Sequence, residues 1–99
     1  MLYQVWPENV LEFIQTKNCF VMDVREESEF RKGHLPKAVH VEEEEIVSGE
    51  FTLSKKIPVL VYCDEGSRSI QIARQLIMKG YRVYNLAGGY EAYLRHQKS

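Results

Sequence analysis

The sequence contains little of several features that would define other classes of protein. Only two cysteines and three prolines occur among 99 residues, which excludes a disulfide-rich secreted scaffold. The longest apolar runs, such as residues 59–63, are a fraction of the length needed to cross a bilayer, so we expect no membrane span. The formal net charge is −1, which gives no global field to gather nucleic acid, so any anion site must come from local dipoles.

Targeting signals, repeats and linkers are also missing from the sequence. The first eight residues have neither a basic start nor an apolar stretch of signal-peptide length, so we expect a cytoplasmic protein with reduced cysteines. A chain of 99 residues has room for one hydrophobic core. We therefore expect residues 1–99 to form a single domain.

Short apolar runs alternate with helical patterns along the chain. Runs rich in β-branched and aromatic residues predict three strands and two weaker ones, at residues 20–24, 59–62 and 81–86, and at 3–5 and 38–41. Apolar spacing and stop signals predict helices at residues 7–17, 26–32, 67–79 and from about 90 to the C-terminus. This alternation predicts an α/β fold with a parallel sheet covered on both faces, and ligands at the carboxyl ends of its strands.

Cys63 is the most distinctive chemical group in the sequence. It follows the strand predicted over residues 59–62 and precedes the turn Asp64-Glu65-Gly66-Ser67-Arg68-Ser69, which opens the best-defined helix. A thiol in this position faces the free N–H groups and partial positive charge of a helix N-terminus, which favour the reactive thiolate. A buried, inert thiol is the alternative interpretation, and the composition of the turn disfavours it.

The turn itself suggests an anion-binding loop. Gly66 permits a positive-φ conformation in which successive amides point inward, around the outer sulfur of a persulfide or around an oxyanion. Arg68 is expected to supply a planar donor fork near the loop, and Ser67 or Ser69 to cap the helix, although both roles also occur in purely structural settings.

Four motifs in order give the sequence a resemblance to the rhodanese (sulfurtransferase) family, in particular to its small single-domain members. The motifs are Asp23-Val24-Arg25 with Glu29-Phe30, Gly33-His34-Leu35-Pro36 with Ala38, residues 63–69, and Leu86-Ala87-Gly88-Gly89-Tyr90 with Ala92. The resemblance implies a five-stranded parallel sheet flanked by helices. It also implies that Cys63 accepts sulfane sulfur as a persulfide and passes it to cyanide or a thiol.

Loop length and loop charge refine what the resemblance implies. Sulfurtransferases of this family have four residues between the cysteine and the arginine, as Cys63 and Arg68 do here, whereas related phosphatases and arsenate reductases have five. Relatives that use thiosulfate well often carry basic side chains directly after the cysteine, but this sequence has Asp64 and Glu65. Two acids at the mouth repel a dianion, so we expect thiosulfate to be a poor donor.

The remaining polar candidates have both structural and functional interpretations. Asp23 and Arg25 match a family motif near the active edge, where Arg25 either contacts substrate or, with Asp23, braces loops. Cys19 begins its strand, whereas Cys63 ends another. In a parallel sheet the two cysteines are then separated by roughly the length of a strand, at about 3.3 Å per residue, which is too far for a disulfide. His34, in a loop, is a candidate base near the thiol, although sulfur transfer needs no base if the helix and amides already hold the thiolate. Neither it nor the other two histidines has metal-ligand spacing, so no metal or cofactor is expected.

The leading functional hypothesis is therefore a sulfurtransferase or sulfur carrier. Its expected partners are a small sulfur donor or a persulfide-bearing protein, and a thiol acceptor. A non-catalytic rhodanese-like binding module and a thiol phosphatase are the alternatives. The acidic run of residues 42–45 is interpreted as a solvated face or the first turn of a helix, with a docking site for a basic partner as a further alternative.

Overall fold

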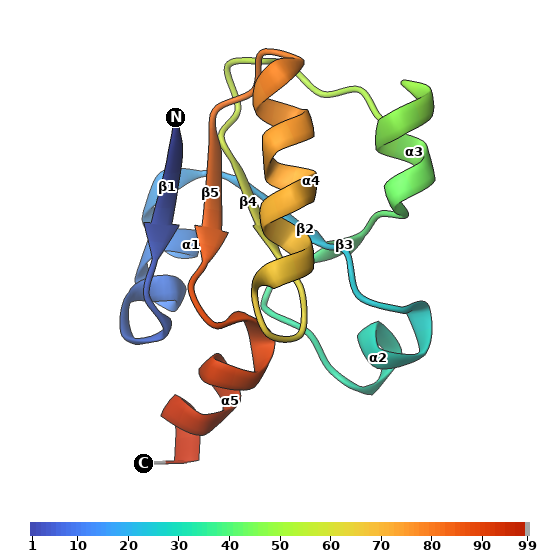
Figure 1. Cartoon of the computed structure of the whole chain (residues 1–99). Coiled ribbons are helices and arrows are strands. Elements are labelled where there is room, and N and C mark those ends of the chain that lie inside the picture. Colours follow the sequence, from blue (N-terminus) through green and yellow to red (C-terminus); the bar gives the residue numbers. More distant parts are fainter. Residues whose placement is uncertain (99) are drawn as a thin grey trace.

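The computed structural model describes residues 1–98, in which strands and helices alternate along the chain (Figure 1). The strands are β1 (Leu2–Val5), β2 (Phe20–Asp23), β3 (Val39–His40), β4 (Val59–Tyr62) and β5 (Val83–Leu86). The helices are α1 (Val10–Lys17), α2 (Glu27–Lys32), α3 (Glu43–Ser48), α4 (Ser67–Met78) and α5 (Gly89–Lys98), with a 3₁₀ turn, η1, at Pro7–Asn9. The sequence predicts that the last helix continues to the C-terminus, where Ser99 lies outside the described residues.

The five strands form one sheet in the order β1-β5-β4-β2-β3. Every neighbouring pair is parallel. The predicted five-stranded parallel sheet is therefore confirmed. Parallel strands need crossover connections, and here the helices supply them. All carboxyl ends of the strands consequently lie at one edge of the sheet, seen at the lower end of the arrows in Figure 1.

Two apolar cores lie on opposite faces of the sheet. Helices α1 and α5 cover one face, where Val10, Ile14 and Tyr90 pack with strand residues such as Leu60 and Leu86. Helices α3 and α4 cover the other face, where the packed residues are Ile46, Ile72, Ala73 and Leu76 with Met22, Val59, Val61 and Val83. The central strand β4 is buried along its whole length, which explains why it reads as a continuous apolar run.

The structure differs from the predicted elements at their ends and in one helix, α3, for which only a first turn was offered as one interpretation of residues 42–45. The helix predicted from Pro7 starts with the 3₁₀ turn η1, and α1 begins only at Val10. The strand predicted from residue 38 shortens to Val39–His40. The acidic run forms the first turn of α3, where Glu42 and Glu45 make a reciprocal capping box. Across residues 1–98, no helix has the length and apolarity required to span a membrane.

Candidate active site at the carboxyl edge of the sheet

Cys63 lies where β4 ends and the chain turns into α4. The turn requires Gly66, whose φ of 105° lies in the left-handed region that side chains other than glycine rarely adopt. Gly66 is itself the N-cap of α4, and within residues 1–98 no side-chain hydrogen bond caps the N-terminus of this helix, so the prediction that Ser67 or Ser69 would cap it was wrong. The hydroxyl of Ser67 bonds Glu65 instead, at 3.1 Å.

Two backbone amides converge on the Cys63 sulfur. The N–H of Gly66 donates to Sγ at 3.1 Å and the N–H of Ser69 at 3.3 Å. The Ser69 hydroxyl oxygen lies 3.4 Å from the same sulfur. Amide donors at a helix N-terminus stabilise negative charge. The sulfur is thus held by peptide dipoles rather than packed only among aliphatic side chains.

Behind the sulfur, Ser69 and Asn85 form a buried polar pair that sequence reasoning missed. Ser69 is 0% exposed and Asn85 is 1% exposed. The Ser69 hydroxyl donates to Asn85 Oδ1 at 2.6 Å. Asn85 is a buried polar residue in the otherwise apolar strand β5. An asparagine within an apolar strand was visible in the sequence, and it could have indicated a buried hydrogen bond, because a buried amide needs a partner.

The turn between β5 and α5 holds the other side of the loop. The N–H groups of Tyr90 and Glu91, at the start of α5, donate to the carbonyls of Cys63 and Asp64 at 2.8 and 2.9 Å. A Cβ at Gly89 would come within 2.5 Å of the Asp64 carbonyl oxygen. The Gly88-Gly89 turn therefore allows two backbones to approach closely, which fixes the path of residues 63 and 64.

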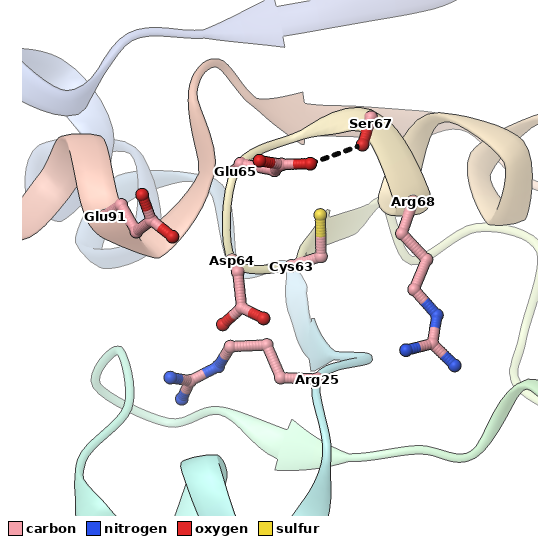
Figure 2. A pocket seen from close by; sticks show the side chains of 7 residues that line it. All are labelled: Arg25, Cys63, Asp64, Glu65, Ser67, Arg68 and Glu91. Atoms are coloured by element: carbon pink, nitrogen blue, oxygen red, sulfur yellow. Dashed lines mark hydrogen bonds between the residues drawn. The ribbon is translucent and has the colours of Figure 1, made fainter.

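The sulfur opens onto a pocket of about 330 Å³ with a mixed charged lining (Figure 2). Its lining residues are Arg25, Cys63, Asp64, Glu65, Ser67, Arg68 and Glu91. Figure 2 shows the Arg68 side chain directed away from the sulfur. Its guanidinium lies 3.5 Å from the Glu26 carboxylate. The expected donor fork of Arg68 over the loop is therefore not found, and Arg68 pairs with Glu26 at the solvent-exposed N-terminus of α2 instead.

Asp23 and Arg25 form a buried ion pair that braces the edge of the sheet. Arg25 Nη2 lies 2.8 Å from Asp23 Oδ2, and the two side chains are 2% and 0% exposed. Arg25 also donates to the Gly33 carbonyl at 2.6 Å and lies over the Tyr90 ring at 4.2 Å. Burial alone would lower the pKa of Arg25, but hydrogen bonds and charge from Asp23 outweigh it and raise that pKa. The bracing interpretation is supported, and Arg25 additionally lines the pocket.

The other candidates lie away from the sulfur. Cys19 and Cys63 are both free thiols, and burial raises the pKa of Cys19. His34 stacks on Phe30 with a 4.2 Å centroid distance and bonds the Leu35 carbonyl, and it is not part of the pocket lining. In the part of the chain that the structure describes, no three His, Cys, Asp or Glu side chains are grouped to hold a metal ion.

Comparison with known proteins gives one consistent family. The model of the rhodanese-like domain matches residues 7–96, so the chain belongs to the rhodanese-like domain family. A thiosulfate sulfurtransferase, GlpE, from Coxiella burnetii is 30% identical over 86 residues, which are 86% of this chain and 80% of that protein. A sulfurtransferase from Allochromatium vinosum is 34% identical over 82 residues, 82% of this chain and 77% of that protein.

Solved structures show the same relationship. A rhodanese homolog from Thermus thermophilus is 33% identical, with a TM-score of 0.74, over 90% of this chain and 98% of that chain. A rhodanese-related protein from Thermoplasma volcanium has a TM-score of 0.84 at 21% identity, over 95% of this chain and 92% of that chain. The predicted family and fold are thus confirmed, and sulfurtransferase activity is established at the level of the family.

Proposed function

We propose that this chain, acting as one domain over residues 1–99, is a sulfurtransferase that carries sulfane sulfur as a persulfide on Cys63. The observation that carries the proposal is the pair of amides of Gly66 and Ser69 on Sγ, at the mouth of a pocket, in a rhodanese-like domain. Such amides stabilise the anionic sulfur of the attacking thiolate without a separate general base. This supports a nucleophilic role for Cys63.

The proposed reaction has two displacement steps. In the first, the Cys63 thiolate attacks the outer sulfur of a donor. A new S–S bond forms to Sγ, and the donor's own bond breaks with its electron pair leaving on sulfite or on a thiolate. In the second, cyanide or an acceptor thiolate attacks the outer sulfur of Cys63-S-S⁻. The S–S bond then breaks, and its electron pair returns to Sγ as the thiolate. Neither step consumes an external oxidant or reductant.

The charge at the pocket mouth supports one class of donor over another. Asp64, Glu65 and Glu91 line the pocket with two arginines, and Arg25 and Arg68 are each paired with a carboxylate. The uncompensated charge is therefore negative, which disfavours the thiosulfate dianion. We propose a persulfide-bearing protein or a small thiol persulfide as donor and a thiol as acceptor. The two free thiols fit a reducing compartment, for which we propose the cytoplasm.

The proposal predicts a persulfide on one defined cysteine. After incubation with a glutathione persulfide donor, we expect the intact mass to rise by one sulfur, and dithiothreitol to remove it. The Cys63→Ser variant is expected to gain no sulfur, and its thiocyanate formation from thiosulfate and cyanide is expected to fall by about a thousandfold or more, since it loses the nucleophile.

Cys19→Ser is the matched control, because Cys19 is the second free thiol, lies just before β2 and does not line the pocket. It is expected to load sulfur and turn over like the parent protein. Undiminished loading in Cys63→Ser, with loss in Cys19→Ser, would overturn the assignment. A Cys63-dependent release of phosphate from an aryl phosphate, without sulfur loading, would favour the thiol phosphatase.

A further inference from the structure

The Ser69 hydroxyl can donate its single proton to only one acceptor at a time. Its oxygen lies 2.6 Å from Asn85 Oδ1, 3.3 Å from the Gly66 carbonyl and 3.4 Å from Cys63 Sγ. The shortest of these distances is that of a strong O–H···O bond, while the other two are long. The proton therefore belongs to the bond with Asn85, and the lone pairs of the hydroxyl remain available to the sulfur.

The orientation of the Asn85 amide is fixed from its other end. Asn85 Nδ2 donates to Gln4 Oε1 at 3.2 Å and to the Leu86 carbonyl at 3.4 Å. Two acceptors on the amino group leave Oδ1 facing Ser69. Among the described residues, the Ser69 hydroxyl is the donor that satisfies this buried oxygen. Turning the proton toward the sulfur would leave Oδ1 buried without a partner, which is unfavourable.

From this geometry we propose that Asn85 is a positioning residue that holds the Ser69 proton away from Cys63. The hydroxyl oxygen then faces Sγ as an acceptor. A thiol S–H can donate to it, as the 3.4 Å contact allows, whereas a thiolate meets a lone pair there. Ser69 and Asn85 thus favour states in which Sγ is neutral and oppose part of the thiolate stabilisation supplied by the two backbone amides.

The consequence for sulfur transfer rests on the proposed function. In Cys63-S-S⁻ the negative charge lies on the outer sulfur and Sγ is uncharged. Transfer to an acceptor breaks the S–S bond and returns the electron pair to Sγ. An arrangement that favours neutral Sγ stabilises the loaded form over the emptied thiolate. Asn85 therefore favours retention of the bound sulfur until a strong acceptor arrives, as suits a sulfur carrier.

The test is the pH dependence of alkylation of Cys63 by iodoacetamide, measured by mass in a Cys19→Ser background. Asn85→Leu has a similar volume and offers no acceptor, so the Ser69 proton becomes free to bond the thiolate. We expect the alkylation midpoint to fall by about one to two units, the effect of one added hydrogen bond to an anion. In Asn85→Leu combined with Ser69→Ala the freed proton is absent, so the midpoint is expected to return to that of Ser69→Ala alone.

The direction of the midpoint shift in Ser69→Ala shows whether the Ser69 hydroxyl acts toward the sulfur as an acceptor, as proposed, or as a donor. If the hydroxyl is an acceptor toward sulfur, removing it lowers the midpoint, whereas removing a donor to the thiolate raises it. A higher midpoint in Ser69→Ala, or an unchanged or higher one in folded Asn85→Leu, overturns the proposal. Asn85→Asp keeps an acceptor for the Ser69 proton, so its alkylation midpoint is expected to lie at or above that of the parent. This variant keeps the test decisive if Asn85→Leu does not fold. A lower midpoint in Asn85→Asp also overturns it.

Alkylation requires no sulfur donor, so this outcome is independent of the proposed function. If the alkylation midpoints shift as expected but no variant loads sulfur, the role of Asn85 is supported and the proposed sulfurtransferase function is rejected. Where loading does occur, Asn85→Leu is expected to release sulfur to cyanide a few-fold faster than the parent. An equal or slower release, with a lowered midpoint, would overturn the retention role.

Discussion

At the residue scale, Tyr62 combines a buried phenol with a structural hydrogen bond. Its side chain is fully buried at the end of β4, and its hydroxyl oxygen accepts the N–H of Leu35 at 3.1 Å. Burial raises the pKa of Tyr62, and the neighbouring Asp23 carboxylate raises it further. The phenol therefore stays protonated in the folded protein at pH values at which an exposed tyrosine ionises.

Tyr62→Phe is expected to change both the free energy of unfolding near neutral pH and its dependence on pH. Near neutral pH the variant is expected to be less stable by about 1–2 kcal/mol, because the buried Leu35 N–H loses its acceptor. Above about pH 10 the unfolded tyrosine releases its proton while folded Tyr62 retains it, so the parent protein loses up to about 1.4 kcal/mol per pH unit through this group. The variant lacks this loss, and the gap narrows.

Urea unfolding of both proteins between about pH 7 and 11 measures that gap, and comparison at each pH cancels the titration of other groups. Fluorescence of Trp6 and far-UV circular dichroism give two independent signals of unfolding. A gap that is constant across this range would show that Tyr62 ionises equally in the folded and unfolded chains.

Other single residues show what a sequence does and does not reveal. Cys63 could be located because a strand, a cysteine, a glycine and a helix follow one another within a few positions, and each is a local signal. The pairing of Arg68 with Glu26 could not be located, because Glu26 lies more than forty positions earlier in the sequence. Lys37 adopts a φ of 66°, a left-handed conformation that favours glycine, and nothing in the local sequence pattern indicates it.

At the scale of elements, the N-terminus of α5 is the partner that fixes the loop before α4. Its first N–H groups bond the carbonyls of Cys63 and Asp64, which satisfies donors that a helix end leaves free. The contact requires the backbone of Gly89 to lie against residues 63 and 64. Helix lengths and faces could be predicted from local spacing, but this contact joins segments about twenty-five positions apart and has no local signal.

Gly89→Ala is expected to disturb this contact between elements. The added Cβ would lie 2.5 Å from the Asp64 carbonyl oxygen and 2.7 Å from that of Cys63, so the loop or α5 must move. We expect a loss of about 2–4 kcal/mol of stability from overpacking and left-handed strain. We also expect at least a tenfold fall in sulfur transfer, since displaced catalytic groups lose rate steeply.

Gly49→Ala is the matched control, because Gly49 also has a positive φ, 86°, but no atom within 4 Å of the added Cβ. It reports the cost of the left-handed conformation alone, about 1–2 kcal/mol, without loss of activity. Thermal unfolding and thiocyanate formation compare the two. Equal stability and activity in both variants would show that α5 does not set the path of the loop.

At the scale of the whole molecule, the alternation of strands and helices could be predicted, and with it the edge that carries the site. The order β1-β5-β4-β2-β3 could not be derived from the pattern, because which strands pair is decided by packing across the chain. The positions of Asp64 and Glu65 predicted a local charge imbalance, and the fold adds Glu91 from α5 to the same pocket lining. Acids gather at the mouth of the pocket although the formal charge of the whole chain is only −1.

That imbalance predicts a donor preference that charge substitution can reverse. In the variant Asp64→Asn with Glu65→Gln, two exposed acids beside Cys63 lose their charge while the backbone of the loop is unchanged. Because each acid repels a dianion, we expect kcat/KM for thiosulfate to rise by about fivefold to tenfold at low salt. The rise is expected to shrink in 0.5 M NaCl, where the Debye length is only about 4 Å.

Glu44→Gln with Glu50→Gln changes the net charge equally but lies at and just after α3, outside the pocket lining. This control is expected to leave thiosulfate kinetics within about twofold of the parent, since charges beyond a Debye length are largely screened. With an uncharged alkyl persulfide as donor, all three proteins are expected to react alike. A similar gain in both double variants, or a gain that survives high salt, would show that the acids at the mouth do not select the donor.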